Sequence, residues 1–411
     1  MSQIRDRLQF FRQQMAAFEG SADPRRAIES GYYVEQPRKS LAESIAARIA
    51  LRPSSTHLLL GSIGSGKTTQ LLRACDRLNE IEDISAYYVD VSSYTDIYDI
   101  KSGFFISILG LFLSEIGNFI DPEATQKHRQ IIEEIVHGNN PKTLNQQLLK
   151  QLDDDIIQLR DEISRRQPKG ILSSKSIKYS PEKKLGQALV NLQNIIFTKS
   201  KKKIVFLFDG LDRINNIEGL LSFLIPDLKR ISEIEIGMIL VIPLVTEHTK
   251  YWDALNQSVT AVHYQPHFDI ENDSEARDFF EKILKKRSVE DFIDPVAIED
   301  LIYFSGGVLR DLINLTQAAI EESYLSNSNE LLQIYVTVAA GSFGRAKILG
   351  VSNTEIETLK KIVLTNEFIP RTNEDLRLVM TQRILEYQYP KLRYAVHPTI
   401  KPLIETINTA L

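Results

Sequence analysis

Eight residues near the start of the chain have the spacing of a phosphate-binding loop. Residues 61–68 read GSIGSGKT and fit the pattern G-x-x-x-x-G-K-[ST] at every defined position. In such a loop, main-chain N–H groups curl around phosphate oxygens, the lysine neutralises the β- and γ-phosphates, and the hydroxyl ligates Mg²⁺. The sequence therefore predicts binding of a nucleoside triphosphate with Mg²⁺. The residues expected to contact it are Gly61, Ser62, Gly64, Ser65, Gly66, Lys67, Thr68 and Thr69.

The elements on either side of this loop are the ones that must position it. HLLL at 57–60 predicts a short apolar strand, and QLLRACDRLNEI at 70–81 predicts a helix with its apolar residues on one face. Strand, glycine-rich turn and helix in this order form the setting in which the motif binds phosphate. This context favours a ligand-binding loop over the alternative, a plain glycine turn before a helix.

A second group of candidate residues follows the most apolar strand. Residues 204–208 read IVFLF, which is typical of a central parallel strand buried on both faces, and Asp209 comes next. An acidic residue there can hold Mg²⁺ and its water near the γ-phosphate, and Asp212 can polarise the attacking water. The alternatives are a helix N-cap for Asp209, and for Asp212 a solvated turn residue or a partner of Arg213.

Composition excludes several classes of protein. The chain of 411 residues is 43% hydrophobic and 25% charged, which argues against disordered and fibrous proteins. With 49 Lys and Arg against 54 Asp and Glu, the net charge of −5 gives no global field for nucleic acid or an anionic membrane. Cys75 is the single cysteine and can form neither an internal disulfide nor a CxxC site. No HExxH or GxSxG pattern is present.

The ends and apolar runs of the chain indicate its location. The N-terminus MSQIRDRLQFFRQQ lacks the apolar core of a secretory signal. The most apolar run, at 103–113, falls well short of the roughly 20 residues that cross a bilayer. We therefore expect a cytoplasmic protein with no membrane contact, which the single cysteine also fits.

Three segments together resemble a known group of ATPases. GSIGSGKTT at 61–69, FLFDGLDR at 206–213 and SGGVLRDL at 305–312 are similar to the additional-strand P-loop ATPases, near the border of the AAA+ proteins and the STAND signalling ATPases. AAA+ proteins usually place glutamate directly after the aspartate, and here that place is Gly210. Asp212 therefore becomes the substitute candidate for water activation. The resemblance covers about residues 31–345 and implies ATP binding without indicating a pathway.

The resemblance implies roles for residues outside the loop. In this group a helical lid carries an arginine that senses the γ-phosphate, and Arg310 in the GGxxR-like segment matches it; the alternative is a surface arginine paired with Asp311 or Glu321. Thr246 or Glu247, at the end of LVIPLVTEH, would contact the γ-phosphate or the attacking water, although a strand-end threonine that caps the next turn is an equal alternative. The segment 32–38 would cover adenine or pack in the core.

The expected architecture is a doubly wound parallel-sheet α/β core with appended helices. Strands are expected at 57–60, 85–91, 204–208, 237–245 and 258–264, and a polar insertion at 121–200 holds helices over 122–137 and 142–166 and a basic loop at 165–184. The expected domains are an N-terminal helix at 1–30, a P-loop ATPase core at 31–265, a helical lid at 266–345 and a winged-helix-like domain at 346–411, with a hairpin over 383–396.

Two functions remain open at this point. In the first, the chain is a slow ATPase switch that couples nucleotide state to a protein partner or to a homo-oligomer, in which a neighbouring subunit supplies a further arginine. In the second, it is an origin-recognition or transposition-like loader whose winged helix holds duplex DNA. From residue 351 onward eight Lys and Arg face seven Asp and Glu, a weak electrostatic footprint that slightly favours the first.

Overall fold

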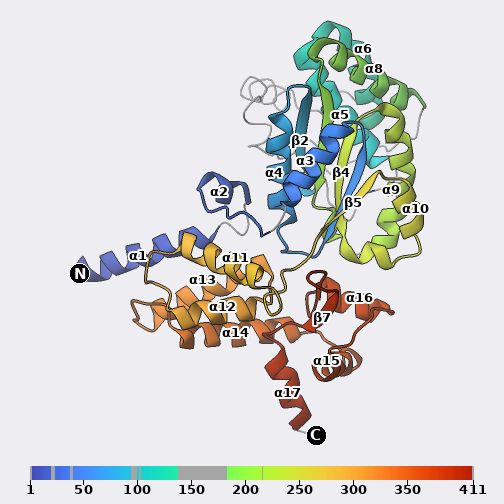
Figure 1. The fold of residues 1–411 in the computed structure, drawn as a ribbon. Coiled ribbons are helices and arrows are strands. Elements are labelled where there is room, and N and C mark those ends of the chain that lie inside the picture. The colour runs from blue at the N-terminus through green and yellow to red at the C-terminus, as the bar shows by residue number, and fades with distance from the viewer. Residues whose placement is uncertain are drawn as a thin grey trace. The chain divides into compact units, whose positions relative to one another are not determined.

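The computed structural model describes residues 2–19, 24–37, 40–93, 100, 103–137, 183–214 and 216–409. The chain forms two compact units (Figure 1). We call residues 41–60 and 70–264 the sheet unit, and residues 1–40, 61–69 and 265–411 the helical unit. The helix expected over 142–166 lies outside the described residues, and so does the basic loop at 165–184 except for its last two residues.

The sheet unit is built on a parallel five-stranded sheet, which confirms the α/β fold class. The strand order is β2-β3-β4-β1-β5, so β4 lies between β1, which leads into the phosphate-binding loop, and β3, which ends in Asp209. The strands are β1 (Thr56–Gly61), β2 (Ile84–Asp90), β3 (Lys203–Asp209), β4 (Gly237–Pro243) and β5 (Ala261–Gln265).

Helices cover both faces of the sheet because the central strands are apolar at successive positions, whose side chains point to opposite faces. Val205 and Leu207 of β3 pack in one cluster with helices α3 (Leu41–Leu51) and α4 (Lys67–Asn79). On the opposite face, the ring of Phe208 contacts Phe105 with centroids 5.8 Å apart, and Phe206 contacts Phe112 at 5.6 Å; both partners belong to α5 (Phe104–Ile120).

The described ends of the predicted insertion at 121–200 pack in this helical layer. Helices α6 (Pro122–His137) and α8 (Lys183–Ser200) both pack on α5. Close approach requires a glycine in α5, since a Cβ on Gly117 would lie 2.7 Å from the Cγ2 of Thr125. Helices α9 (Ile217–Ile231) and α10 (Trp252–Gln257) complete the unit.

The N-terminal helix α1 (Ser2–Phe18) is an integral part of the helical unit. Phe11 and Phe18 are buried in its core, and the Phe11 ring lies 5.7 Å from that of Phe292. Arg7 donates to the main-chain oxygens of Tyr324, in the last turn of α13, at 2.9 Å and of Ser328, just after that helix, at 2.8 Å. The other helices of this core are α11 (Ser274–Arg287), α12 (Pro295–Ser305), α13 (Leu309–Leu325) and α14 (Gln333–Ile348), and α2 (Pro24–Glu29) belongs to the same unit.

The C-terminal segment follows α14 with two capped helices and a hairpin, in the order that the sequence predicts. Ser352 and Thr372 each form a capping box at a helix start. One further helix that the sequence did not predict closes the chain. The elements are α15 (Asn353–Thr365), α16 (Asn373–Met380), the antiparallel pair β6 (Ile384–Tyr387) and β7 (Arg393–Val396), and α17 (Lys401–Thr409). Among the described helices, none is both long and apolar enough to span a bilayer.

Candidate functional site

The glycines of the phosphate-binding loop are required by its backbone. Gly64 has φ of 78° and Gly66 has φ of 97°, a region that L side chains rarely adopt. At Gly61 a Cβ would collide with the main-chain oxygen of Gln265. The loop therefore has its present path only with glycine at these three positions, and it leads directly into α4, which begins at Lys67.

The Lys67 side chain folds back onto the phosphate-binding loop and hydrogen-bonds to its main chain. Its ammonium is buried and donates to the main-chain oxygens of Gly61 at 2.9 Å and Ser62 at 2.7 Å. The Ser65 hydroxyl donates to the Ser62 oxygen at 2.9 Å, and Gln265 donates to the Ser65 oxygen at 3.1 Å. Thr68 and Thr69 follow in the first turn of α4 and are half-buried. A buried cation beside a glycine loop at a helix N-terminus fits a nucleotide phosphate.

Arg310 lies beside this loop. Its main-chain N–H donates to the Gly64 oxygen at 3.3 Å, and a Cβ on Gly64 would lie 2.9 Å from the Cβ of Arg310. Gly306 and Gly307, with φ of 60° and 75°, form the turn that starts α13 immediately before it. The structure thus brings Arg310 and the phosphate-binding loop together within the helical unit, and the Arg310 side chain is exposed.

The neighbouring Asp311 is engaged elsewhere, which removes one alternative for Arg310. Its Oδ2 accepts a hydrogen bond from His397 Nε2 at 3.1 Å and one from Lys347 Nζ at 2.9 Å. Burial alone would raise the pKa of Asp311, but the His397 hydrogen bond and the Lys347 charge lower that pKa to about 2. Asp311 is therefore an ionised, buried carboxylate that joins α13 to the end of α14 and to the residue after β7. The sequence analysis had not identified this cluster.

Two buried histidines accompany Asp311. His397 receives hydrogen bonds at Nδ1 from Thr399, whose hydroxyl lies 2.8 Å away, so its Nε2 carries the proton donated to Asp311. Burial lowers the pKa of His397 to about 4 and that of His267 to about 3. Both rings are thus neutral at pH 7, and His267 Nδ1 has no hydrogen-bond partner among the described residues.

Asp209 lies at the carboxyl end of β3 in the sheet unit. The side chain is 5% exposed, Oδ1 accepts from the Gly210 N–H at 2.8 Å, and Oδ2 accepts from the Tyr88 hydroxyl at 3.0 Å. The N-cap of the next α-helix, α9, is Asn216, so the capping alternative for Asp209 is wrong. Buried carboxylate oxygens at a strand end are the hard ligands that Mg²⁺ prefers.

Asp212 follows the end of β3, and Asp90 ends the neighbouring strand β2. The sequence did not single out Asp90 as a site residue. Asp212 is half-buried in the short 3₁₀ turn η4 (Leu211–Arg213), which follows β3 directly. Asp90 ends β2 and pairs in register with Asp209, and its Oδ1 accepts from the Ser92 N–H and hydroxyl at 3.0 and 2.6 Å. The signal that could have identified Asp90 is an aspartate at the end of a predicted parallel strand.

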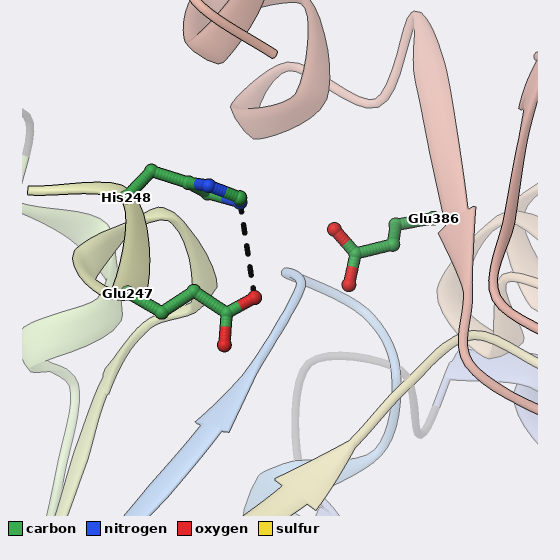
Figure 2. A group of neighbouring side chains, drawn as sticks. All are labelled: Glu247, His248 and Glu386. Atoms are coloured by element: carbon green, nitrogen blue, oxygen red, sulfur yellow. Dashed lines mark ion pairs between the residues drawn. The ribbon is translucent and has the colours of Figure 1, made fainter. Parts of the chain in front are cut away.

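Thr246 and Glu247 lie in the 3₁₀ turn η6 (Leu244–His248), which follows β4. Thr246 is fully buried, and its hydroxyl has no hydrogen-bond partner among the described residues, so it does not cap the turn. Glu247 is half-buried, and its Oε1 lies 3.8 Å from His248 Nε2. Figure 2 marks this pair with a dashed line. Glu386, the third side chain drawn in Figure 2, belongs to β6 of the helical unit. An unpaired buried hydroxyl favours Thr246 over Glu247 as the polar contact to a ligand.

The segment before the loop packs mainly in the helical core. Tyr32 and Val34 contact the buried cluster, and the Arg287 guanidinium lies 5.1 Å from the centre of the Tyr32 ring. Gln36 of this segment lies close to the loop, with its Nε2 3.7 Å from the position of a Cβ on Gly66. Of the two expectations for this aromatic segment, core packing describes Tyr32.

Comparisons with known proteins give likenesses of structure only. No protein-family model and no curated protein matches the chain. The ORC2 protein of Aeropyrum pernix is 13% identical, with a TM-score of 0.43 over 92% of this chain and 97% of that one. A Walker-type ATPase of Pyrococcus abyssi is 15% identical, with a TM-score of 0.45 over 91% and 98%. The RuvB branch migration motor of Thermotoga maritima is 11% identical, with a TM-score of 0.40 over 88% and 94%. These values assign no role to any residue here.

Proposed function

We propose that this chain binds ATP with Mg²⁺ and hydrolyses it slowly, as a switch that couples its nucleotide state to a protein partner or to a homo-oligomer. The observation that carries the proposal is the position of the phosphate-binding loop. It is contacted both by the start of α13, through Arg310, and by the C-terminal segment, through a hydrogen bond from Gln382 to the main-chain oxygen of Ile63. A change in the loop therefore has a direct route to the C-terminal segment.

The proposed roles follow from the chemistry of each side chain. The loop amides and Lys67 would bind the β- and γ-phosphates, and Arg310 would neutralise developing charge on the γ-phosphate. Thr68 and Asp209 would hold Mg²⁺, which supplies charge neutralisation at the phosphate oxygens when bound. Thr246 would donate to the γ-phosphate or orient water. Water activation would fall to Asp212 or to Glu247.

The C-terminal segment is tied to the start of α13, which supports the coupling role. The Tyr387 hydroxyl donates to the Gly306 oxygen at 2.8 Å, and Val308, Leu385 and Tyr387 form one buried cluster. Asp311 adds an ion pair with Lys347 and a hydrogen bond from His397. Because these contacts are made by the residues next to Arg310, movement of that arginine toward a phosphate would be transmitted to the hairpin β6–β7.

The charges of the C-terminal segment favour a protein partner over DNA. Three of its arginines are held within the helical unit: Arg377 pairs with Glu355, Arg393 pairs with Asp269 through Nε at 2.6 Å, and Arg383 donates to the oxygens of Lys347 and Leu349 at 2.7 and 2.8 Å. Helix α16 also begins with Glu374 and Asp375. Arginines engaged in this way are not available for phosphate contacts.

ATP turnover with and without duplex DNA tests this proposal. We expect slow Mg²⁺-dependent release of phosphate that duplex DNA does not change and that Lys67→Ala abolishes. DNA stimulation that disappears in Lys67→Ala would instead favour the DNA-loading function. Absence of both turnover and nucleotide binding would contradict the proposal.

Separate replacement of the two acidic candidates identifies the residue that activates water. We expect one of the two variants, Asp212→Asn or Glu247→Gln, to retain ATP binding and to lose hydrolysis, which marks the replaced residue as the activator, and the other variant to retain most of both. If neither change slows turnover, the assignment of water activation to these residues is wrong.

A further inference from the structure

Two adjacent tyrosines of β2 point to opposite faces of the sheet. The Tyr87 ring lies 5.6 Å from the Phe206 ring, on the face covered by α5. Tyr88 packs on the opposite cluster, with α3 and α4, and its hydroxyl donates to Asp209 Oδ2 at 3.0 Å. The parallel register sets this contact, because it pairs Asp90 with Asp209 and so places Tyr88 two residues before the strand end.

Both oxygens of the Asp209 carboxylate are fixed by these contacts. Oδ1 accepts from the Gly210 N–H at 2.8 Å and Oδ2 accepts from Tyr88. The Ser92 hydroxyl donates to Oδ1 of the neighbouring Asp90 at 2.6 Å and so orients that carboxylate. A carboxylate oxygen has more than one acceptor site, so each Asp209 oxygen can accept these bonds and still bind a metal ion or its water. The Tyr88 bond constrains Oδ2 in addition to the main-chain bond that constrains Oδ1.

We infer that Tyr88 is a positioning residue for the magnesium ion of the proposed ATP site, acting through its hydrogen bond to Asp209. The inference rests on the proposed function, since it concerns the carboxylate assigned there to Mg²⁺. Partners that orient a metal ligand from behind typically change metal affinity by 10- to 100-fold when they are removed. Tyr88 would therefore contribute to Mg²⁺ binding without touching the ion or the nucleotide.

Tyr88→Phe deletes the hydroxyl and keeps the ring in its apolar contacts. Tyr87→Phe is the matched control, because it makes the same change one residue earlier on the same strand, on the face away from Asp209. The affinity of the full-length protein for a fluorescent ATP analogue is measured in EDTA and then across a magnesium titration. Binding of Mn²⁺ to the protein–ATP complex, followed by electron paramagnetic resonance, reports the metal directly.

We expect Tyr88→Phe to require about 10-fold more Mg²⁺ or Mn²⁺ for the same effect, with unchanged affinity for the analogue in EDTA. Tyr87→Phe should match the wild type in both measurements. In an Asp209→Asn background, Tyr88→Phe should have no further effect on the metal dependence, because its partner is altered. This double-mutant cycle separates action through Asp209 from a general effect on the strand.

Two results would overturn the inference. A metal dependence in Tyr88→Phe equal to that of the wild type would remove the positioning role and leave the proposed ATPase function intact. An equal loss of affinity with and without metal would assign Tyr88 to the structure of the sheet only. If the wild-type protein binds no nucleotide under any condition, the proposed function fails and this inference fails with it.

Discussion

The Gln382 side chain donates a hydrogen bond to the main-chain oxygen of Ile63, in the middle of the phosphate-binding loop. Gln382 immediately follows the turn at the end of α16 and has φ of 58°. Its side chain also lies 3.7 Å from the position of a Cβ on Gly64. One side chain thus connects the C-terminal segment to the loop that we propose binds the nucleotide, over 319 residues of sequence.

Replacement of Gln382 by asparagine should loosen this connection. Asparagine tolerates a positive φ but is one methylene shorter, so it loses the contact without backbone strain. Loss of one neutral buried hydrogen bond costs about 1 kcal/mol, or about a fivefold change in the docking equilibrium. We expect amide hydrogen exchange at residues 382–387 to become about fivefold faster, and its response to ATP to diminish. Gln333→Asn, on the exposed start of α14, is the control. Unchanged exchange would show that Gln382 makes no such link.

Removal of the Asp311 charge should destabilise the helical unit. Asp311→Asn keeps the shape of the side chain but leaves the Lys347 ammonium, 2.9 Å away, without its buried anion. Breaking one partner of a buried pair costs about 3 kcal/mol. Urea unfolding at pH 7.5 measures this change, and Asp278→Asn on the exposed face of α11 should stay within about 0.5 kcal/mol of the wild type. Equal stability of the two variants would contradict a structural role for the cluster.

Folding stability should fall as the pH drops below about 6.5. Burial lowers the pKa of His128 and lowers that of four other histidines to about 3 or 4, so the unfolded chain binds more protons than the folded chain between about pH 6.5 and pH 4. Each of these four contributes about 1 kcal/mol of loss between pH 7.5 and 5.5. Burial raises the pKa of Asp227 to about 6, which has the opposite sign and offsets part of the effect. Urea unfolding at these two pH values tests the prediction. The four histidines are His57, His263, His267 and His397.

A single substitution measures how much the hydrogen-bonded pair His57 and His263 contributes to this pH dependence. His57 Nδ1 lies 2.9 Å from His263 Nε2. The Ser55 hydroxyl donates to the Arg52 oxygen at 2.6 Å and therefore accepts from His57 Nε2. His263 is therefore the donor in the pair. Replacing His263 by glutamine keeps a donor and removes a titrating group, so the loss of stability between pH 7.5 and 5.5 should shrink by about 1 kcal/mol. A slope equal to that of the wild type would contradict the assignment.

Arg7 should stabilise the end of α13 from the N-terminal helix. Its guanidinium donates to the Tyr324 and Ser328 oxygens and lies 4.5 Å from the centre of the Tyr324 ring. A hydrogen-bonded cation at a helix C-terminus contributes about 1.5–3 kcal/mol. Arg7→Ala should lower the free energy of unfolding by about 2 kcal/mol, whereas Arg12→Ala, on the exposed face of α1, should have little effect. Similar results for the two variants would show that the contact with α13 contributes nothing.

Features with a local signal in the sequence were predicted well. The turn at 61–66 needs glycine at defined positions, and the run before Asp209 is apolar at every position, so both appear in the structure where expected. The sheet and its strands follow from the same kind of pattern, although β4 ends at Pro243, two residues before the predicted end, because η6 begins there. The roles assigned to Asp212, Glu247 and Arg310 remain predictions.

Features set by contacts across the chain were not predicted. The sequence shows an amphipathic first helix but not that its phenylalanines pack with Phe292. It shows two adjacent tyrosines in β2 but not the strand register that brings the Tyr88 hydroxyl within hydrogen-bonding distance of Asp209. It also shows a polar stretch at 121–200 but not that α8 packs on α5. Each of these depends on a partner far away in the sequence, which periodicity and composition cannot identify.

The central claim is that the loop at 61–68 binds ATP, and calorimetric titration of ATP with Mg²⁺ into the purified protein tests it most directly. The account predicts saturable binding at one site per chain. It also predicts that Lys67→Ala lowers the affinity by about 100-fold, equivalent to about 3 kcal/mol, while Lys282→Ala, an exposed lysine of α11, leaves it unchanged. Absence of binding in the wild type, or equal affinity in Lys67→Ala, would contradict the account.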